Sequence, residues 1–194
     1  FNDFDNGILY KLDSNFNIIK SFQDSQFQDV RDIQVGFGDL VYGIGSNNRN
    51  IFACTTGGEE IIWTSLDVFS GVDITAISLS YNNKYIYVAS AEGKVRKIDV
   101  SDGSAVWGSD FLTNSSSLEV NNLEVDRNED IYATIVPDGG ATETIKIRPD
   151  KTEQWLASNI VTTHSAKIND IAVDWYFNVY TGDNNGKIRR ISQT

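Results

Sequence analysis

A unit of four short apolar segments recurs along this chain of 194 residues. The third segment of the unit aligns most clearly, and its copies begin 43, 43, 50 and 43 residues apart. Within the segments apolar residues alternate with polar ones or run unbroken, and β-branched and aromatic types dominate, which is typical of β-strands. The repeat therefore predicts an all-β protein of four-stranded units. The copies are GILYKLD from Gly7, NIFACT from Asn50, GKVRKID from Gly93, ETIKIR from Glu143 and GKIRRIS from Gly186.

Four short strands in a period of about 40 to 45 residues are typical of a β-propeller, in which each antiparallel four-stranded sheet forms one blade. We expect one domain over residues 1–194 with four to five blades. An open ring would expose unpaired strand edges, so these blades should belong to a larger ring of about six to eight, completed by more of a longer chain or by another copy. The predicted units are a partial blade at 1–22, blades at about 30–65, 73–109 and 119–158, and a partial blade at 168–194.

The charge of the chain argues against several classes of partner. Sixteen basic and 27 acidic residues give a net charge of −11, which repels nucleic acid.

No apolar run is long enough to span a membrane. The single cysteine, Cys54, lies in a strand pattern and is expected to be a buried, inert thiol. A virion or extracellular location is favoured over the cytoplasm on the basis of the polar, Asn-rich loops.

Candidate metal and catalytic residues are few. Asp126, Asn128 and Asp130 have the spacing that opens a calcium loop, but Ile131 and Pro137 stand where an EF-hand needs Gly and Glu. This segment is better interpreted as a turn between two strands, and we expect no metal or cofactor. One histidine, His164, cannot build a nucleophilic triad without partners that the sequence does not indicate. A pair of carboxylates brought together from different blades stays open as an alternative.

Residues 99–107, DVSDGSAVW, resemble the tryptophan-docking repeat of quinoprotein (PQQ)-like propellers, with Asp99, Gly103 and Trp107 at matching places. Trp63 and Trp155 occupy the corresponding outer strand of two other units. The resemblance implies that these indole rings wedge between adjacent blades. It does not extend to quinone chemistry, because the vicinal disulfide of quinoprotein dehydrogenases needs two cysteines.

Two further resemblances support the same architecture. Residues 170–191 are similar to an NHL-type repeat, with Asp174, Asn178, Tyr180 and Asp183 at matching places. His164, before the strand NDIAV, resembles the histidine of WD40 repeats. A fold shared by so many families does not transmit a function.

Propellers bind partners mainly through the loops between second and third strands and between blades. We therefore expect a noncatalytic module that docks a protein or glycan within a larger assembly, such as a virion or cell-surface structure. The alternative is a hydrolase or lyase that acts on a sugar or lactone with carboxylates at the channel mouth. Phe69, Phe111 and Trp175 lie near these loops, and we expect them to pack at blade edges or, as the alternative, to stack on a sugar or anchor a partner. No catalytic residue is assigned, and the predicted binding residues are Asn47, Asn48, Arg49, Glu92, Asp138, Asp183, Asn184 and Asn185.

Overall fold

The computed structural model describes residues 2–3, 7–56, 60–112, 119–136, 142–151, 153–156 and 166–191. In these residues the chain forms five antiparallel sheets, here called sheets I to V, and in each of them the spatial order of strands follows the chain. Within this described part no helix is long and apolar enough to cross a membrane.

The strands lie close to the segments that the repeat predicts. Sheet I has β1 (Asn2–Asp3), β2 (Ile8–Leu12) and β3 (Ile18–Gln23), followed by a 3-10 turn, η1 (Ser25–Phe27). Sheet II has β4 (Ile33–Gly36), β5 (Leu40–Gly45), β6 (Asn50–Thr55) and β7 (Ile61–Ser65), with the short helical turn α1 (Ser46–Arg49) between β5 and β6. Sheet III has β8 (Ile74–Leu79), β9 (Tyr85–Ser90), β10 (Lys94–Asp99) and β11 (Phe111–Leu112). Sheet IV has β12 (Glu119–Val125), β13 (Ile131–Val136), β14 (Glu143–Ile147) and β15 (Glu153–Leu156). Sheet V has β16 (Ile168–Val173), β17 (Val179–Asp183) and β18 (Ile188–Ile191).

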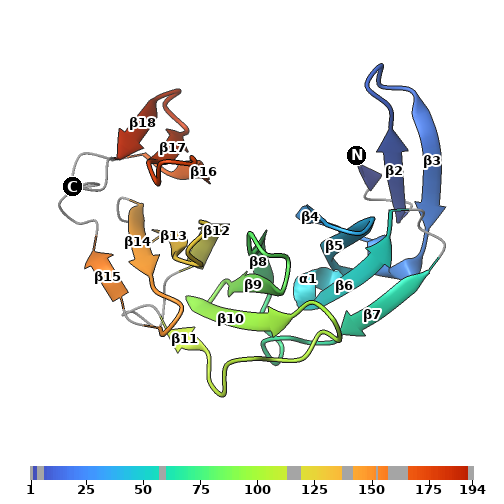
Figure 1. Cartoon of the computed structure of the whole chain (residues 1–194), viewed down its shortest axis with the longest axis horizontal. Coiled ribbons are helices and arrows are strands. Elements are labelled where there is room, and N and C mark those ends of the chain that lie inside the picture. Colours follow the sequence, from blue (N-terminus) through green and yellow to red (C-terminus); the bar gives the residue numbers. More distant parts are fainter. Residues whose placement is uncertain are drawn as a thin grey trace.

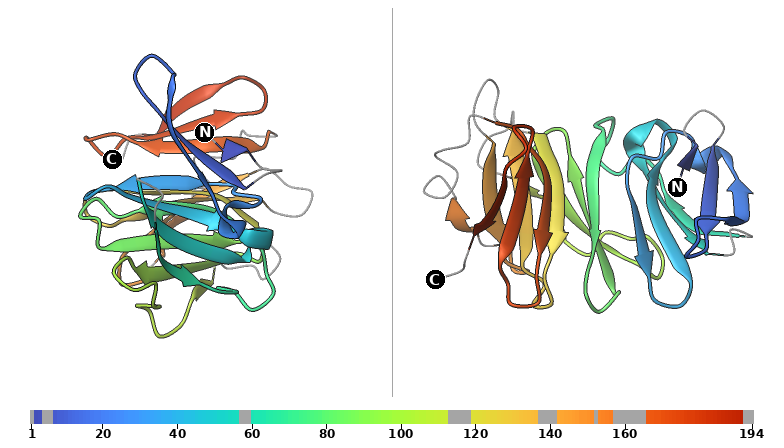
Figure 2. Two further views of the ribbon diagram at one scale, coloured as in Figure 1. Left: turned by 90° about the vertical axis from the view of Figure 1, so that its right-hand side faces the viewer. Right: turned by 90° about the horizontal axis from the view of Figure 1, so that it is seen from above.

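The sheets stand side by side along an open arc (Figure 1). The first strands of sheets II to V, which are β4, β8, β12 and β16, lie on the inside of the arc and contact one another in succession. The last strands, β7, β11 and β15, lie on the outside. Figure 2 shows that successive sheets are stacked face against face, with their strands running between the same two faces of the molecule.

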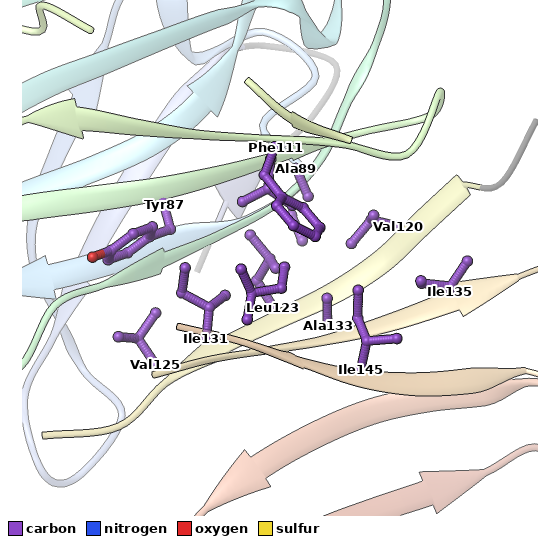
Figure 3. Packing of buried hydrophobic residues seen from close by; sticks show 13 residues of the cluster. Tyr87, Ala89, Phe111, Val120, Leu123, Val125, Ile131, Ala133, Ile135 and Ile145 are labelled. Carbon is purple, nitrogen blue, oxygen red and sulfur yellow. The ribbon is translucent and has the colours of Figure 1, made fainter. Parts of the chain in front are cut away.

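Apolar side chains fill the space between each pair of neighbouring sheets. Because side chains of a strand alternate between its two faces, β9 packs Ile86 and Val88 against sheet II and Tyr87 and Ala89 against sheet IV. All four of these side chains are fully buried. Figure 3 shows the layer between sheets III and IV, where Phe111 and Tyr87 lie over residues of β12, β13 and β14. This burial on both faces explains the unbroken apolar runs in the second strands.

Tryptophan side chains join neighbouring sheets near their outer edges. Trp63 of sheet II donates its indole N–H to the Val100 carbonyl that follows β10 in sheet III, at 2.8 Å. The same ring covers Gly103, whose φ is +74°. Trp107 packs on Tyr87, and the Lys151 Nζ of the next sheet lies 5.8 Å from its ring centre. The tryptophan docking implied by the resemblance is thus seen at Trp63 and Trp107, whereas the side chain of Trp155 lies outside the described residues.

The repeat places the fourth strand of sheet III at residues 105–109, AVWGS, and this prediction is wrong. Only Ala105 makes an isolated bridge, to Ile98, and the sheet is completed by Phe111 and Leu112 instead. The tight turn in which the Gly103 amide bonds the Asp99 carbonyl ends the hairpin early. The chain then leaves the sheet, and Trp107 packs between sheets. Sheet I also gains a two-residue strand, β1, that the repeat did not predict.

We predict that Gly103→Ala destabilises the fold more than Gly38→Ala does. The two glycines have nearly the same φ, +74° and +73°, so both substitutions carry the cost of a left-handed residue, about 1–2 kcal/mol. An alanine Cβ at Gly103 would lie 2.7 Å from the Trp63 ring, whereas nothing lies within 4 Å at Gly38. Urea unfolding should show an additional loss of about 1–3 kcal/mol for Gly103→Ala. Equal losses for the two variants would contradict the docking of Trp63 on Gly103.

Candidate functional site

The first strands of sheets II to V share one register. In each of them an aliphatic residue pairs with the residue that follows a Val-Tyr or Ile-Tyr pair in the second strand. The residues just before and after the aliphatic residue point to the other side of the first strand. Six of these eight flanking residues are polar, and the other two are Ala76 and Ala172. The aliphatic residues are Ile33, Ile77, Leu123 and Ile171, and their partners are Gly43, Val88, Ala133 and Thr181.

A cavity of about 270 Å³ lies between these four strands on the inside of the arc. Its lining is mainly polar and includes three carboxylates and one guanidinium, each at a flanking position or next to one. These charged residues are Arg31, Asp32, Glu124 and Asp170.

Burial and neighbouring charges raise the pKa of two carboxyl groups of the cavity, Glu124 and Asp32. The pKa of Glu124 is raised to about 7, first by burial and then by the charges of Asp170 and Asp32, while a hydrogen bond from Ser78 lowers it. Burial also raises the pKa of Asp32, although the amides of Ile77 and Ile33 oppose that effect. Near neutral pH the cavity therefore holds a carboxyl group that is about half protonated.

Polar side chains hold the first strands together around the cavity. Asp32 accepts a hydrogen bond from the Ile77 amide of the next sheet, at 3.0 Å. Thr75 and Asn121 lie where the pairing of their strands slips by one residue, as in a β-bulge. Thr75 donates to the Val120 carbonyl, and Asn121 donates to the Ile168 carbonyl at 3.1 Å. Asp32 is thus held by a backbone hydrogen bond from the next sheet, whereas Glu124 is the carboxyl group whose protonation state changes near neutral pH.

This arrangement can carry out two kinds of chemistry. A partly protonated carboxyl beside two others can bind a cation and release its proton, or it can transfer a proton to or from a ligand near pH 7. Among the residues that the structure describes, no group of three acid, histidine or cysteine side chains is placed to hold a metal ion.

The predicted binding residues near α1 lie on a different part of the molecule from this cavity. Asn47 and Asn48 adopt left-handed backbone conformations, with φ of 60° and 57°. Arg49 forms an ion pair with Asp73 at 3.5 Å, in which both side chains are largely exposed. These residues do not line the cavity, and their role in binding a partner stays a prediction.

The remaining predicted residues belong to the same kind of loop in sheets III and V. Glu92 is exposed and pairs with Lys94 at 2.8 Å. Asp183 is buried, and its carboxylate accepts the amides of Asn185 and Lys187, so its observed contacts stabilise the turn. Asn184 and Asn185 are exposed at that turn. Asp138 lies outside the described residues, as does His164.

The candidate calcium loop, the single cysteine and two of the three candidate aromatic residues make contacts within the protein. Asp126 accepts the amides of Asn128 and Asp130 on one oxygen and the Tyr132 hydroxyl on the other, as the turn interpretation predicts. Cys54 is fully buried, and burial raises the pKa of its thiol to about 11. Phe69 and Phe111 are buried between sheets, whereas Trp175 is 58% exposed.

Sequence reasoning did not find the carboxylates of the cavity. The signal was present, because the first-strand segments DIQV, NNLEV and NDIAV each place an acid next to the aliphatic residue. In the shared register of the first strands, Asp32 and Asp170 occupy equivalent positions, and Glu124 lies two residues further along.

We predict that Glu124→Gln stabilises the chain at alkaline pH. The pKa of Glu124 is about 7 in the folded chain against an ordinary 4.5, so between these values the folded state binds more protons than the unfolded state. The free energy of unfolding therefore falls as pH rises through this range, and the loss is complete above pH 7. Relative to wild type, urea unfolding of Glu124→Gln should show little change at pH 4.5 and a gain of about 1–2 kcal/mol at pH 8. Exposed Glu92→Gln serves as the charge-matched control, and the same pH-dependent gain in it would contradict the assignment.

Comparisons with known proteins identify the fold and no family. No family model matches the chain, and no curated protein sequence matches it. Among solved structures 972 chains match, so the fold is a common one. One of them is selenomethionine-substituted virginiamycin B lyase from Staphylococcus aureus, a β-propeller, with a TM-score of 0.72 and 12% identity over 96% of this chain. The chain spans 63% of the length of that protein. At this identity the likeness shows the fold alone: an all-β chain of antiparallel sheets with a β-propeller as structural neighbour.

Proposed function

We propose that the chain is an arc of a β-propeller in which sheets II to IV are complete blades and sheets I and V are partial ones. The described residues form eighteen strands, which over 63% of the neighbour's length correspond to about 29 strands, or about seven blades of four. This number lies within the six to eight blades expected from the repeat.

The two ends of the arc support a ring that further strands complete. Among the described residues sheet I has no counterpart of the inner strands β4, β8, β12 and β16. An apolar cavity of about 230 Å³ lies between β2 and β3 on one side and β4 and β5 on the other. Val35, which lines that cavity, is 70% exposed. Within residues 166–191 sheet V has three strands where sheets II to IV have four, and Ile188 of β18 is 81% exposed. Additional strands of the same kind would cover both apolar surfaces.

The function that the geometry supports best is noncatalytic binding of a cationic group in the cavity between the first strands. The carrying observation is the convergence of Asp32, Glu124 and Asp170 from three different sheets, with only Arg31 as a positive charge in the lining. Burial and the charges of Asp170 and Asp32 raise the pKa of Glu124. An ammonium or guanidinium group, presented by a small molecule or by a side chain of a protein partner, would offset both effects. The carboxylate oxygens of Asp32, Glu124 and Asp170 would offset the cost of burying this cationic group.

Binding of n-butylammonium, followed by NMR titration, tests this function. If only deprotonated Glu124 binds the cation, a pKa of about 7 makes binding about tenfold tighter at pH 8 than at pH 6. Glu124→Gln should remove this pH dependence, whereas Glu92→Gln should preserve it. The neutral analogue n-butanol should bind weakly at both pH values. Equal binding of the alcohol and the cation, or a pH-independent affinity in the wild type, would contradict the proposal.

A second candidate is a hydrolase or lyase that acts on a sugar or lactone. The observation that favours it is again Glu124, because an acid–base catalyst works best when its pKa lies near the working pH. The structural neighbour is named a lyase, at 12% identity. Turnover of any substrate in a panel of glycans and lactones, lost in Glu124→Gln with substrate binding retained, would favour the enzyme over the binding module. Docking through the loops and a place in a virion or on a cell surface stay predictions from the sequence.

A further inference from the structure

The turns between first and second strands form one continuous face of the molecule. They comprise residues 37–39, 80–84, 126–130 and 174–178, and they lie at the same end because sheets II to V repeat one strand order. Hydrogen bonds link them from sheet to sheet. The Phe37 amide donates to the Asn83 side chain at 2.8 Å, and the Asn82 side chain donates to Glu129 at 2.8 Å.

Aromatic rings gather on this face and are exposed. Phe37 is 71% exposed, Tyr81 55%, Trp175 58% and Tyr176 80%. Tyr81 and Trp175 come from sheets III and V, yet their rings meet edge to face at 5.8 Å. Phe37, Tyr81, Arg127, Trp175 and Tyr176 are here called the turn patch. None of them lines the cavity between the first strands.

Arg127 is held on this patch by stacking. Its guanidinium carbon lies 4.8 Å from the centre of the Trp175 ring and 4.4 Å from that of Phe177. The side chain is exposed, and among the described residues no carboxylate lies within ion-pair distance of it. A guanidinium fixed by aromatic rings, with its donors turned to solvent, is arranged to take a carboxylate through two parallel hydrogen bonds.

The neighbouring polar groups favour a protein partner over a glycan. The amides of Asn82 and Asn83, which border the patch, already bond to the turns, and Glu129 is occupied by Lys97, Tyr87 and Asn82. These amide and carboxylate groups are therefore engaged within the protein and are not free to bind sugar hydroxyl groups. Trp, Tyr and Arg are the residue types that carry most binding energy at protein interfaces.

We propose that the turn patch docks a protein segment that presents a carboxylate to Arg127 beside apolar side chains that cover the exposed rings. Charge complementarity carries the choice of an acidic segment, since Arg127 is an exposed cation held by Trp175 and Phe177 and forms no ion pair among the described residues. The overall charge disfavours polyanions at long range. Selectivity must therefore come from the local pairing of one carboxylate with Arg127.

Two short peptides test this surface at 0.15 M salt, where long-range repulsion is screened. The probes are acetyl-Leu-Glu-Phe-amide and its Gln analogue, followed through the indole N–H signal of Trp175, which Trp175→Phe assigns among the four tryptophans. The wild type should bind the Glu peptide at least threefold more tightly than the Gln peptide. Arg127→Gln should bring this ratio to about one, and Arg127→Lys should reduce it in part. Arg190→Gln, which removes another exposed arginine, should leave the ratio unchanged.

Four outcomes would overturn the proposal. They are no shift of the Trp175 signal with either peptide, equal affinity of the wild type for both, a ratio that survives Arg127→Gln, and tighter binding of trigalacturonate than of the Glu peptide. Sedimentation of the wild type and of Arg127→Gln measures the oligomeric state of each, and so tests whether a second copy of the chain occupies the turn patch. A dimer that dissociates in the variant would also contradict an independent acidic partner. Failure of these tests leaves cation binding in the cavity unaffected, since the two sites share no residue.

Discussion

Face-to-face packing of neighbouring sheets is the constraint on which the structure depends. Each interior sheet buries apolar side chains on both faces, and separate clusters fill the four spaces between successive sheets. Trp63 sets the contact between sheets II and III near the outer edge through the Val100 carbonyl and Gly103. At the inner edge, polar contacts such as the hydrogen bond from Asn121 of sheet IV to the Ile168 carbonyl of sheet V fix the position of neighbouring sheets. Contacts fixed at both edges bring the first strands together on the inside of the arc.

This packing has a direct consequence for function, because it brings side chains from distant parts of the sequence into contact. Asp32, Glu124 and Asp170 are separated by whole blades in sequence but line one cavity. Tyr81, Arg127 and Trp175 likewise come from three turns and form one surface. Neither group is close in sequence, and each exists only if the sheets keep their angular spacing. The two proposed sites are products of the repeat architecture and not of local motifs.

The sequence predicted much of the fold and little of the site. The spacing of the third strands located most strands because the alternation of apolar residues is set locally by burial on one or two faces. It failed at residues 105–109, where the turn at Gly103 ends the hairpin and Trp107 leaves the sheet to pack between sheets. The resemblance correctly implied the position of Trp63 between sheets. The raised pKa of Glu124 could not be predicted, because burial and the charges of Asp170 and Asp32 arise only after the sheets associate. The exposure of Trp175 could not be predicted either, because it is set by the contact of its turn with the turns of neighbouring sheets.

The pKa of Glu124, measured from its side-chain carboxyl carbon by NMR, tests the central claim most directly. The claim is that first strands of different sheets converge and place their carboxylates within electrostatic reach of one another. The account predicts a pKa of about 7 in the wild type and a lower value in Asp170→Asn, because that variant removes a charge contributed by the neighbouring sheet. A pKa near the ordinary 4.5 in the wild type, or a value that Asp170→Asn leaves unchanged, would contradict the convergence of the sheets.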